Sequence, residues 1–491
     1  MTIDIEINNI EGKVLTHLSK DQLSVISDKC SFKVEGSDFK AAMFKAKTRG
    51  KCNWDGTKRL FNAQTRKFPV GLLHRVSEIF RQSYFDVNII DKRVHLPAQT
   101  MGKFNGREPR EYQRNVVITS LMHGIGTVKA ATGSGKTVMA AQTIHAIGKK
   151  AVFIVHTKDL LYQTKAAFED MFGCEIGQIG DGVVDTKFVT VATVQSLSYA
   201  FNVKFDKYKY DEEYNTIESF DMSADKKREI LTWACGVGTI IFDEVQNVCS
   251  RTASGVRFSF VNADYAFGYS ASPWRDDGSD MMIEGAFGPI ICDVSASMLI
   301  DQGYLVQPHI LIKSVPRVDD MGDKATYESV YRRQVVENTF RNHMIINDAL
   351  EHYNLGRSVL ILVTQIKHGE ILEKMIRDSG NEAIFISGRN RSKYRNKVID
   401  DMRSGKSQLI IATTIADVGL DVPRLNTVIE AGAGKSSVIA LQRVGRIMRK
   451  FPGKDVCWFH TYRDNAPYLY KQVDNKIRIW RTEPRFVIEE V

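Results

Sequence analysis

A phosphate-binding loop constrains this chain more than any other feature. Residues 130–137 read Ala-Ala-Thr-Gly-Ser-Gly-Lys-Thr and precede a helical pattern, and Asp243-Glu244 close the apolar run 239–242. Closely spaced glycines let backbone N–H groups approach phosphate oxygens, and the N-terminus of the following helix adds positive potential. The loop and the acidic strand end together predict a nucleoside triphosphate site with ATP and Mg²⁺ as cofactors. Ala130 stands where the first glycine of such a loop usually lies, so the pattern fits only in part.

The polar side chains of this predicted site have different roles toward phosphate and metal. Lys136 is expected to neutralise phosphate oxygens, and Thr137 and Asp243 are expected to hold Mg²⁺. A Gly/Ser turn before Lys-Thr can also occur without a ligand. An acidic strand end at a suitable distance makes that structural interpretation improbable.

Length and composition narrow the class of protein. A chain of 491 residues is expected to form about two to four domains, because single cores seldom grow past ~250 to 300 residues. The apolar fraction of 43% is ordinary, and no apolar stretch approaches the ~20 residues needed to span a membrane. The N-terminus lacks the basic-then-apolar order of a signal peptide, and the seven cysteines lack metal-ligand spacing. We therefore predict a soluble cytoplasmic protein, in the host cell cytoplasm if a phage encodes it.

The positive charge of the chain is concentrated near its N-terminus. Residues 1–109 contain 19 Lys and Arg against 12 Asp and Glu, and residues 40–67 contain nine basic residues and one acid, Asp55. Aromatic residues lie between these charges. Basic and aromatic side chains together suit a surface that neutralises phosphates and stacks on bases. A solvated amphipathic face with core aromatics fits the same pattern, and only the ATP-site motifs favour nucleic acid.

The spacing of apolar runs predicts an α/β protein with two tandem parallel-sheet domains after a small basic α+β domain. We expect the basic domain over residues 1–103, the first large domain over 104–300 and the second over 301–491. The charged, Tyr-rich insertion at 201–227 reads as a surface excursion or a DNA-facing element, of which the solvated loop is favoured, and residues 315–324 read as a loop. The predicted strands are 151–155, 188–191, 239–242 and 265–269 in the first large domain, and 359–363, 383–386, 408–411, 427–430 and 456–459 in the second.

The order of short motifs resembles that of superfamily 2 helicases and translocases over residues 104–465. This resemblance implies two RecA-like domains and ATP-driven movement along nucleic acid. Arg110-Glu-Tyr-Gln113 resembles the segment that reads adenine, with Gln113 as the base contact. The resemblance extends ATP binding to the following loop residues: Thr132, Gly133, Ser134, Gly135, Lys136 and Thr137.

Asp243-Glu244-Val-Gln246 stands where this family has its acidic motif II. Asp243 would hold Mg²⁺ through water, and Glu244 would polarise the attacking water. Gln246 replaces the usual His or Asp, and its amide can both donate and accept a hydrogen bond toward the next motif. That next motif, motif III, is resembled by Ser270-Ala-Ser272.

Further segments resemble the motifs that hold the nucleic-acid backbone. Each is short, and a strand-end side chain such as Gln195, Ser270, Ser272 or Thr364 could equally be a plain structural hydrogen-bonding group. The order of the motifs is what makes the resemblance specific. The contacts it implies are Thr157, Thr193, Gln195, Thr364, Gly388 and Thr413.

The last two motifs of the family supply the far side of an ATP site. Gly419 and Asp421 match motif V residues that face ATP, and Gln442 matches the start of motif VI. Two arginines three apart on a helix share a face. Arg446 and Arg449 are therefore both predicted to reach the γ-phosphate from one helix.

A narrower resemblance concerns the basic domain. Residues 51–61, which read Lys-Cys-Asn-Trp-Asp-Gly-Thr-Lys-Arg-Leu-Phe, resemble an N-terminal segment of the phage UvsW-type branch-migration helicases. This implies nucleic-acid contacts from Lys51, Trp54, Lys58 and Arg59. A tight Asp-Gly turn with a packed tryptophan would read the same way locally.

These resemblances predict an ATP-dependent DNA helicase or translocase that moves 3′ to 5′ on branched DNA. The expected reactions are fork regression, Holliday-junction migration and the unwinding of D-loops or R-loops, as in bacteriophage DNA replication, recombination and repair. The expected partners are branched or forked DNA and single-stranded DNA; no protein partner is indicated, and a monomer is compatible with the sequence. An RNA helicase and a translocase subunit of a restriction-type system are the alternatives.

Overall fold

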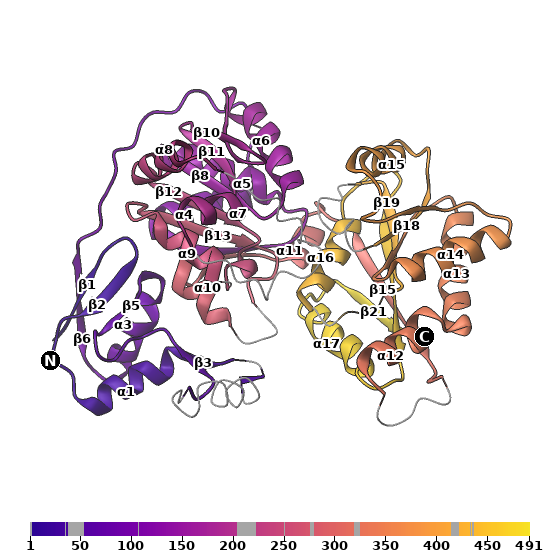
Figure 1. The fold of residues 1–491 in the computed structure, drawn as a ribbon, viewed down its shortest axis with the longest axis horizontal. Helices are drawn as coiled ribbons and strands as arrows, with labels where there is room; N and C mark the ends of the chain where they lie inside the picture. Colours follow the sequence, from indigo (N-terminus) through magenta and orange to yellow (C-terminus); the bar gives the residue numbers. More distant parts are fainter. Residues whose placement is uncertain are drawn as a thin grey trace. The chain divides into compact units, whose positions relative to one another are not determined.

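The computed structural model describes residues 2–34, 36–37, 54–106, 108–203, 222–249, 251–274, 279–318, 325–413, 422–432, 434 and 437–491. The chain forms two compact units, Met1–Ala130 with Gly135–Val294 and Ala131–Ser134 with Ser295–Val491. The first unit thus contains both the small N-terminal sheet and the first large sheet (Figure 1). The predicted contacts Lys51, Gly419 and Asp421 lie outside the described residues.

The N-terminal part of the first unit is a small mixed sheet in the order β5-β2-β1-β6. Side chains on β1 alternate, with Ile3, Ile5 and Ile7 buried, as a strand with one solvated face requires. Phe61 and Phe68 stack in the same core. The elements are β1 (Thr2–Ile7), β2 (Glu11–Val14), α1 (Lys20–Lys29), β3 (Ser31–Lys33), β4 (Thr57–Arg59), β5 (Lys67–Pro69), η1 (Val70–Leu72), α3 (Leu73–Gln82) and β6 (Asp86–Asp91), with β3 and β4 forming a separate antiparallel pair.

The first large sheet has the order β10-β9-β11-β8-β12-β13-β7-β14 among the described residues. All its neighbouring strands run parallel except β9 and β10. Strands β8 and β11 are buried along their whole length, as expected for a parallel sheet with helices on both faces. Its strands are β7 (Ile125–Ala130), β8 (Ala151–Val155), β9 (Gly177–Gly180), β10 (Val183–Asp185), β11 (Val189–Thr193), β12 (Thr239–Asp243), β13 (Tyr265–Ser270) and β14 (Ile290–Val294).

Helices alternate with these strands along the chain (Figure 1). They are α4 (Glu111–His123), α5 (Lys136–Ile147), α6 (Lys158–Phe172), α7 (Val194–Ala200), α8 (Ala224–Cys235), the 3-10 helix η3 (Val245–Cys249), α9 (Arg251–Ser259) and α10 (Asp280–Phe287). Helix α8 corrects one expectation, because residues 224–227 were predicted to belong to a solvated insertion. Ser223 caps the helix by accepting a hydrogen bond from Lys226 N, and Ile230 and Trp233 anchor it in the core.

The second unit contains a parallel sheet in the order β17-β18-β16-β19-β20-β15-β21 among its described residues. Its strands are β15 (Gln307–Val315), β16 (Ser358–Val363), β17 (Ile384–Ile386), β18 (Leu409–Thr413), β19 (Leu425–Glu430), β20 (Val456–Asp464) and β21 (Val487–Glu490). Its helices are α11 (Ala296–Asp301), α12 (Tyr327–Tyr331), the π-helix η4 (Arg332–Val336), α13 (Thr339–Asn354), α14 (Ile366–Asp378), α15 (Ser392–Ser404), α16 (Ser437–Ile447) and α17 (Tyr470–Trp480).

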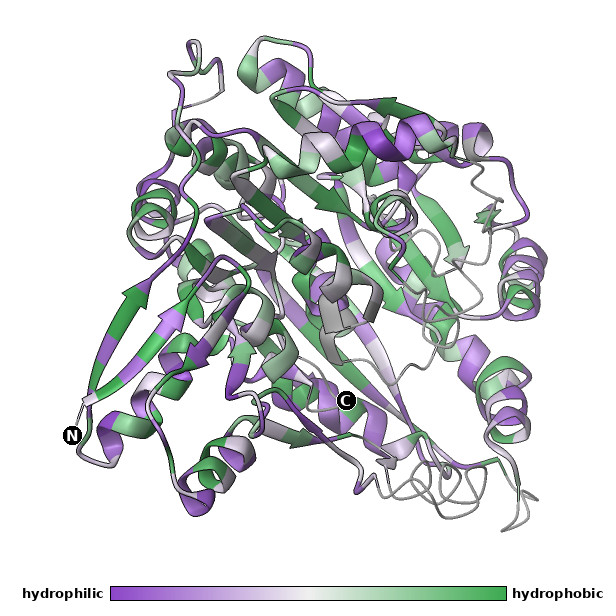
Figure 2. Ribbon diagram, turned by 60° about the vertical axis from the view of Figure 1, so that its left-hand side comes forward, coloured by the Kyte–Doolittle hydropathy of each residue, from purple (hydrophilic) through white to green (hydrophobic). Residues whose placement is uncertain are grey.

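The predicted α/β class and the predicted strands of both large domains are confirmed. Figure 2 shows the apolar residues concentrated in the strands, while polar residues dominate the outer helices. Of the predicted loop at 315–324, Val315 is the last residue of β15 and 319–324 lie outside the described residues. Among the residues that the structure describes, no helix combines the length and apolar character that crossing a membrane requires.

The small N-terminal sheet region packs tightly on helix α10. A Cβ atom added to Gly71 would lie 2.1 Å from the backbone oxygen of Glu284, so only glycine allows this approach. Arg75 binds the Glu284 carboxylate with two nitrogens, Nη2 lying 2.5 Å from Oε2. Met281 packs against the N-terminal core. The N-terminal part and the first large sheet are therefore joined by a close interface and not only by a linker.

Arg257 on α9 completes this interface. Its side chain is fully buried and donates to the backbone oxygens of Ala286 (3.1 Å) and Asn9 (3.5 Å). Burial lowers the pKa of Arg257 to about 10. The Asn9 amide also pairs with both backbone groups of Val94, which begins the segment that leads to α4. One guanidinium thus joins α9, α10 and the β1–β2 turn.

Two buried histidines of the second unit predict acid sensitivity. Burial, and then electrostatic interactions with His460 and Arg357, lower the pKa of His352 to about 3, and burial lowers that of His368 to about 3. The unfolded chain takes up these protons near pH 6.5, whereas the folded chain resists them. Their contribution to stability is therefore complete above about pH 6.5 and is lost progressively as the pH falls toward 3.

We expect the thermal midpoint of the second unit to fall between pH 7.5 and pH 5, and we expect His368→Gln to reduce that fall. The exposed His343→Gln variant serves as the control and should keep the wild-type pH profile. Differential scanning calorimetry at several pH values provides the measurement. An unchanged profile in the His368 variant would show that this histidine is not a source of the acid sensitivity.

Candidate nucleotide and nucleic-acid site

The phosphate loop lies between the C-terminal end of β7 and the first residue of α5. Gly133 and Gly135 have φ values of 86° and 85°, a left-handed conformation that disfavours side chains. Helix α5 begins at Lys136, so its first N–H groups are available to an anion. Ser134 is buried, and Thr132 and Thr137 are half-buried. The local backbone is therefore suited to cradle phosphate.

Gln113 lies against this loop. Its side-chain oxygen accepts a hydrogen bond from Arg110 N at 3.0 Å, and its nitrogen lies 2.8 Å from where a Cβ of Gly135 would be. The Arg110 guanidinium donates to the Tyr112 hydroxyl. The start of α4 therefore brings the predicted adenine-reading residues to the loop. Any side chain in place of Gly135 would displace Gln113.

The acidic pair lies at the end of β12, whose last residue is Asp243. Lys136 Nζ lies 3.4 Å from Glu244 Oε1, and Glu244 N donates to Asp243 Oδ1 at 3.1 Å. Burial, and then the negative charge of Glu244, raise the pKa of Asp243 to about 7. Glu244 has a φ of 50°, which a residue with a side chain rarely adopts. Two adjacent, half-buried carboxylates suit a divalent cation, which Asp243 and Thr137 would hold.

Gln246 joins motif II to motif III. Its Nε2 donates to Glu244 Oε2 at 2.9 Å, and its Oε1 accepts from Ser270 Oγ at 2.6 Å. Ser270 Oγ also accepts from Ser272 N. An amide can serve both neighbours because it carries a donor and an acceptor, whereas a carboxylate could not donate. Gln246 therefore connects the Glu244 carboxylate with the end of β13, and its predicted link to the γ-phosphate stays a prediction.

Three predicted nucleic-acid contacts of the first unit have structural duties. Thr157 caps α6 by accepting from Leu160 N, and the buried Thr193 caps α7 by accepting from Ser196 N. Gln195 donates to the backbone oxygen of His156 and so ties the two segments together. Their nucleic-acid role stays a prediction, in which backbone N–H groups at the start of α6 are the better candidates for phosphate contact.

His156 is a residue of this site that the sequence patterns did not single out. It follows the end of β8 beside β12, and its ring is buried. Burial lowers its pKa to about 4, although the negative charge of Glu244 acts in the opposite direction. The imidazole is therefore neutral. The signal that could have identified His156 is its position as a polar residue directly after a buried strand, which pairs with the strand of motif II.

In the second unit, three predicted contacts follow neighbouring strands. Thr364 comes after β16, Gly388 after β17 and Thr413 at the end of β18, and these strands are adjacent in the sheet. Thr364 and Gly388 are exposed, whereas Thr413 is buried and its hydroxyl has no hydrogen-bond partner among the described residues. Parallel strands end at one edge, so the sheet gathers these three positions.

Motif VI differs from the prediction. Gln442 and Arg446 lie on α16, which ends at Ile447, so Arg449 is not on the helix. Arg449 instead forms a β-bridge with Leu305. Burial lowers the pKa of Arg449 below its usual value. The expectation that both arginines share a helical face is therefore wrong, because backbone pairing withdraws the chain from the helix after Ile447.

The predicted contacts of the N-terminal part gather at the β3–β4 pair. Trp54 is half-buried and donates its indole N–H to Thr57 O at 2.9 Å. Arg59 is paired with Asp55 through two hydrogen bonds of 3.2 and 2.6 Å. Lys58 is half-exposed on β4. For Trp54 and Arg59 the turn-forming interpretation therefore has direct support, and the phosphate contact of Lys58 stays a prediction.

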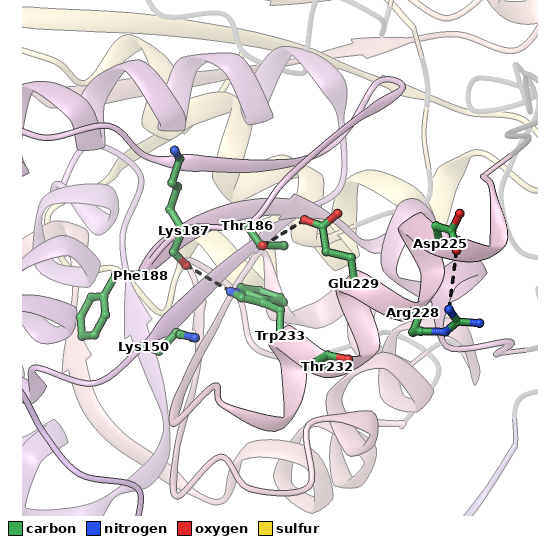
Figure 3. Close-up of a pocket in the computed structure, with 9 residues that line it drawn as sticks. All are labelled: Lys150, Thr186, Lys187, Phe188, Asp225, Arg228, Glu229, Thr232 and Trp233. Carbon is green, nitrogen blue, oxygen red and sulfur yellow. Dashed lines mark hydrogen bonds and ion pairs between the residues drawn. The ribbon is translucent and has the colours of Figure 1, made fainter.

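A cavity of about 690 Å³ lies elsewhere on the first unit (Figure 3). Its lining includes Lys150 and Phe188, which precede β8 and β11, so it lies at the sheet edge opposite to the phosphate loop. Its charged groups are engaged with one another, as in the Arg228–Asp225 pair and the hydrogen bond from Thr186 to Glu229. It is not the nucleotide site.

Two protein-family models match this chain. Residues 106–275 match the res subunit of type III restriction enzymes, and residues 342–451 match the conserved C-terminal helicase domain. Together they cover strands β7 to β13 of the first large sheet, β16 to β19 of the second and every described motif of the candidate ATP site. The chain therefore belongs to superfamily 2 of the helicases, a family of ATP-dependent DNA helicases and translocases.

Individual relatives agree with this assignment. Helicase 22 of Sulfolobus islandicus filamentous virus is 28% identical over 408 residues, which cover 78% of this chain and 68% of the relative. The ATP-dependent DNA helicase uvsW of Enterobacteria phage T4 is 22% identical over 446 residues, covering 86% of this chain and 84% of the relative. The DNA 3′-5′ helicase Rad25 of Haloarcula marismortui is 26% identical over 348 residues, covering 69% of this chain, which spans about half, 50%, of that relative.

A solved structure shares the fold. The HsdR subunit fragment of a type I restriction enzyme from Vibrio vulnificus aligns with a TM-score of 0.56 at 16% identity, over 94% of this chain and 83% of that chain. At such low identity the similarity establishes the tandem-sheet architecture and nothing about the substrate.

The hydrogen bond from Ser270 to Gln246 predicts a defined catalytic defect. In Ser270→Ala, the Gln246 amide loses one of its two anchors, so Glu244 is held less firmly beside the loop. A lost hydrogen bond of ~0.5 to 1.5 kcal/mol corresponds to roughly a 3- to 10-fold fall in kcat, with the KM for ATP little changed. Steady-state ATPase assays with saturating single-stranded DNA measure this.

Ser259→Ala is the control for this experiment, because that hydroxyl bonds only locally to Gly255 O on α9. Both variants should melt close to the wild type. A Ser270→Ala protein with wild-type kcat would show that the Glu244–Gln246–Ser270 link does not support hydrolysis.

Proposed function

We propose that the protein is an ATP-driven DNA translocase that acts on branched DNA: it regresses forks, moves Holliday junctions and unwinds D-loops or R-loops. The observation that carries this proposal is the attachment of the basic N-terminal part to α9 and α10. Helix α9 follows motif II in the chain and α10 follows motif III. A DNA-binding element held at that place moves with the ATP-binding lobe.

Similarity supports the proposal beyond the motor. The alignment with T4 uvsW covers 86% of this chain, which is more than the whole span from the start of the first family match at residue 106 to the end of the second at residue 451. It therefore includes residues outside the motor. A relative from Sulfurisphaera tokodaii is described as the DNA 3′-5′ translocase XPB2, which supports a 3′ to 5′ direction.

The chemistry follows from the side chains of the first unit. Lys136 neutralises phosphate charge, and Glu244 orients and polarises the attacking water. A bound Mg²⁺ supplies neutralisation of charge on the β- and γ-phosphates. ATP displaces the Lys136–Glu244 pair because its phosphates compete for the ammonium group. Gln246 then carries the resulting shift of Glu244 to Ser270.

In this proposal the second unit, or second lobe, supplies the arginines and the second set of strand contacts. Arg446 and Arg449 stabilise the charge of the transferring phosphoryl group when the lobes close on ATP. Strand contacts at the start of α6 in the first lobe and at Thr364 and Gly388 in the second grip the backbone in turn. Closure and reopening then move the strand by one step for each ATP.

Two other functions use the same motor. An RNA helicase would be stimulated by RNA at least as well as by DNA, so a competition between the two in an ATPase assay separates them. A restriction-type translocase subunit is suggested by the description of the first family model. That role would require a methyltransferase or nuclease partner, and junction processing by the isolated chain would argue against it.

Lys136→Ala tests the assigned ATP site. We expect turnover to be abolished while DNA binding without nucleotide persists, because the lysine charge acts on phosphates of ATP and not on the strand. Lys165→Ala on α6 is the control and should retain turnover. ATPase rates and fluorescence-anisotropy binding to a labelled oligonucleotide report the two properties. Normal turnover by the Lys136 variant would refute the site.

The role of the basic N-terminal part is tested by charge removal at β3 and β4. Lys33→Gln with Lys58→Gln should weaken binding to a Holliday junction and flatten its salt dependence by close to ~0.9 per lost phosphate contact. Single-stranded DNA should still stimulate the ATPase fully. ATP-dependent processing of a Holliday junction, a fork and a tailed duplex should then fall for the first two substrates.

Lys20→Gln with Lys92→Gln is the matched control, since both lysines are exposed on the same N-terminal part and removal of their charge leaves β3 and β4 intact. If the control lowers junction binding as much as the β3–β4 variant does, the effect is one of net charge. If neither variant changes junction processing, the N-terminal part does not read branches.

A further inference from the structure

A buried carboxylate lies beside motif VI in the second unit. Glu430 ends β19 and is 2% exposed. Arg443 on α16 approaches its Oε1 at 2.6 Å, and Lys476 on α17 approaches its Oε2 at 2.6 Å. Thr461 on β20 donates to the same Oε2 at 2.9 Å. One carboxylate therefore joins α16, α17 and the central sheet of the second unit.

The surroundings show that this junction is internal. The side chains of Lys476 and Arg443 are 3% and 9% exposed. Burial alone would raise the pKa of Glu430, but the charges of Lys476 and Arg443 hold it below its usual value. Beside it lies the buried Arg341–Asp464 pair, and Arg341 also donates to Ala431 O at 2.6 Å.

The two carboxylate oxygens of Glu430 have different cationic partners. Arg443 binds Oε1 and Lys476 binds Oε2, each at 2.6 Å. Charge-assisted hydrogen bonds of this length fix the geometry of both groups. The ammonium of Lys476 therefore fixes the second carboxylate oxygen, so that the first is presented to Arg443 in one orientation.

The geometry relates this junction to the reaction. Arg443 lies one helical turn before Arg446, and the apolar face of α16, including Val444 and Ile447, is buried on the sheet. Apolar contacts allow a helix to slide by fractions of an ångström, whereas a charged hydrogen bond of 2.6 Å fixes its position along its axis. A small displacement of α16 would move Arg446 from the place where it meets phosphate.

We propose that Lys476, through Glu430 and Arg443, is a positioning residue for ATP hydrolysis that sets the place of motif VI on the second lobe. This inference rests on the proposed role of Arg446. Lys476 is buried against Glu430, and it belongs to none of the motifs found in the sequence.

Lys476→Met tests the proposal. Removing the ammonium leaves Glu430 bound by Arg443 and Thr461, but the loss of one partner of a buried ion pair is destabilising. The melting temperature should therefore fall, and kcat is measured per folded protein at a temperature well below the transition. The kcat for ATP hydrolysis on saturating single-stranded DNA should fall about tenfold or more, since small misplacements of catalytic groups have large effects. The KM for ATP and the affinity for DNA without nucleotide should hardly change.

Three further variants make the result decisive. Lys471→Met on the exposed side of α17 controls for the helix and should behave as the wild type. Lys476→Arg restores the charge and should recover most of kcat. Arg446→Ala reports on motif VI itself and should be nearly inactive.

Each outcome has one meaning. Wild-type kcat in Lys476→Met beside an inactive Arg446→Ala overturns the positioning role while leaving the proposed function intact. A large fall in melting temperature in both Lys476 variants, with kcat in proportion to folded protein, also overturns it, because the residue is then only structural. A fully active Arg446→Ala removes the proposed role of motif VI and the inference with it.

Discussion

The position of β12 between β8 and β13 is the constraint on which the nucleotide site depends. Parallel strands that pair in register end at the same edge of the sheet. The segments that follow these three strands carry His156, the Asp243–Glu244 pair and the Ser270–Ser272 segment. Strand β7, next to β13, ends at the phosphate loop. Backbone hydrogen bonding thus assembles residues that lie far apart in the chain, before any side chain contributes.

Within this frame, side chains decide how the site responds to ATP. The Lys136–Glu244 pair holds two groups that both have a duty toward phosphate, so ATP binding must separate them. In the proposed mechanism Gln246 transmits a displacement of Glu244 to Ser270, because one amide is hydrogen-bonded to both residues. The left-handed backbone at Glu244 adds to this sensitivity, since such a conformation persists only where its surroundings enforce it.

The sequence identified the proposed catalytic groups more completely than the groups proposed to position them. Lys136, Asp243, Glu244 and Gln113 were recognisable because phosphate and metal chemistry demands particular residue types at particular spacings. The role of Lys476 could not be predicted from the sequence, because its partner Glu430 is distant in sequence and a lone lysine on a helix normally reaches solvent. Arg449 was assigned to a helix from its spacing alone. Its pairing with Leu305 is a contact with a distant segment, which local periodicity does not report.

The sequence by itself determined the two tandem α/β lobes, nine of their strands and the candidates for the phosphate-binding and acidic residues. Local physical rules suffice for these features, since hydrophobic period, glycine conformation and charge act over a few residues. Only the tertiary structure decided that the N-terminal part rests on α9 and α10, that Gln246 bridges two motifs and that a buried carboxylate holds motif VI in place. These arrangements depend on which strands pair and which faces are buried together, and both are properties of the whole fold.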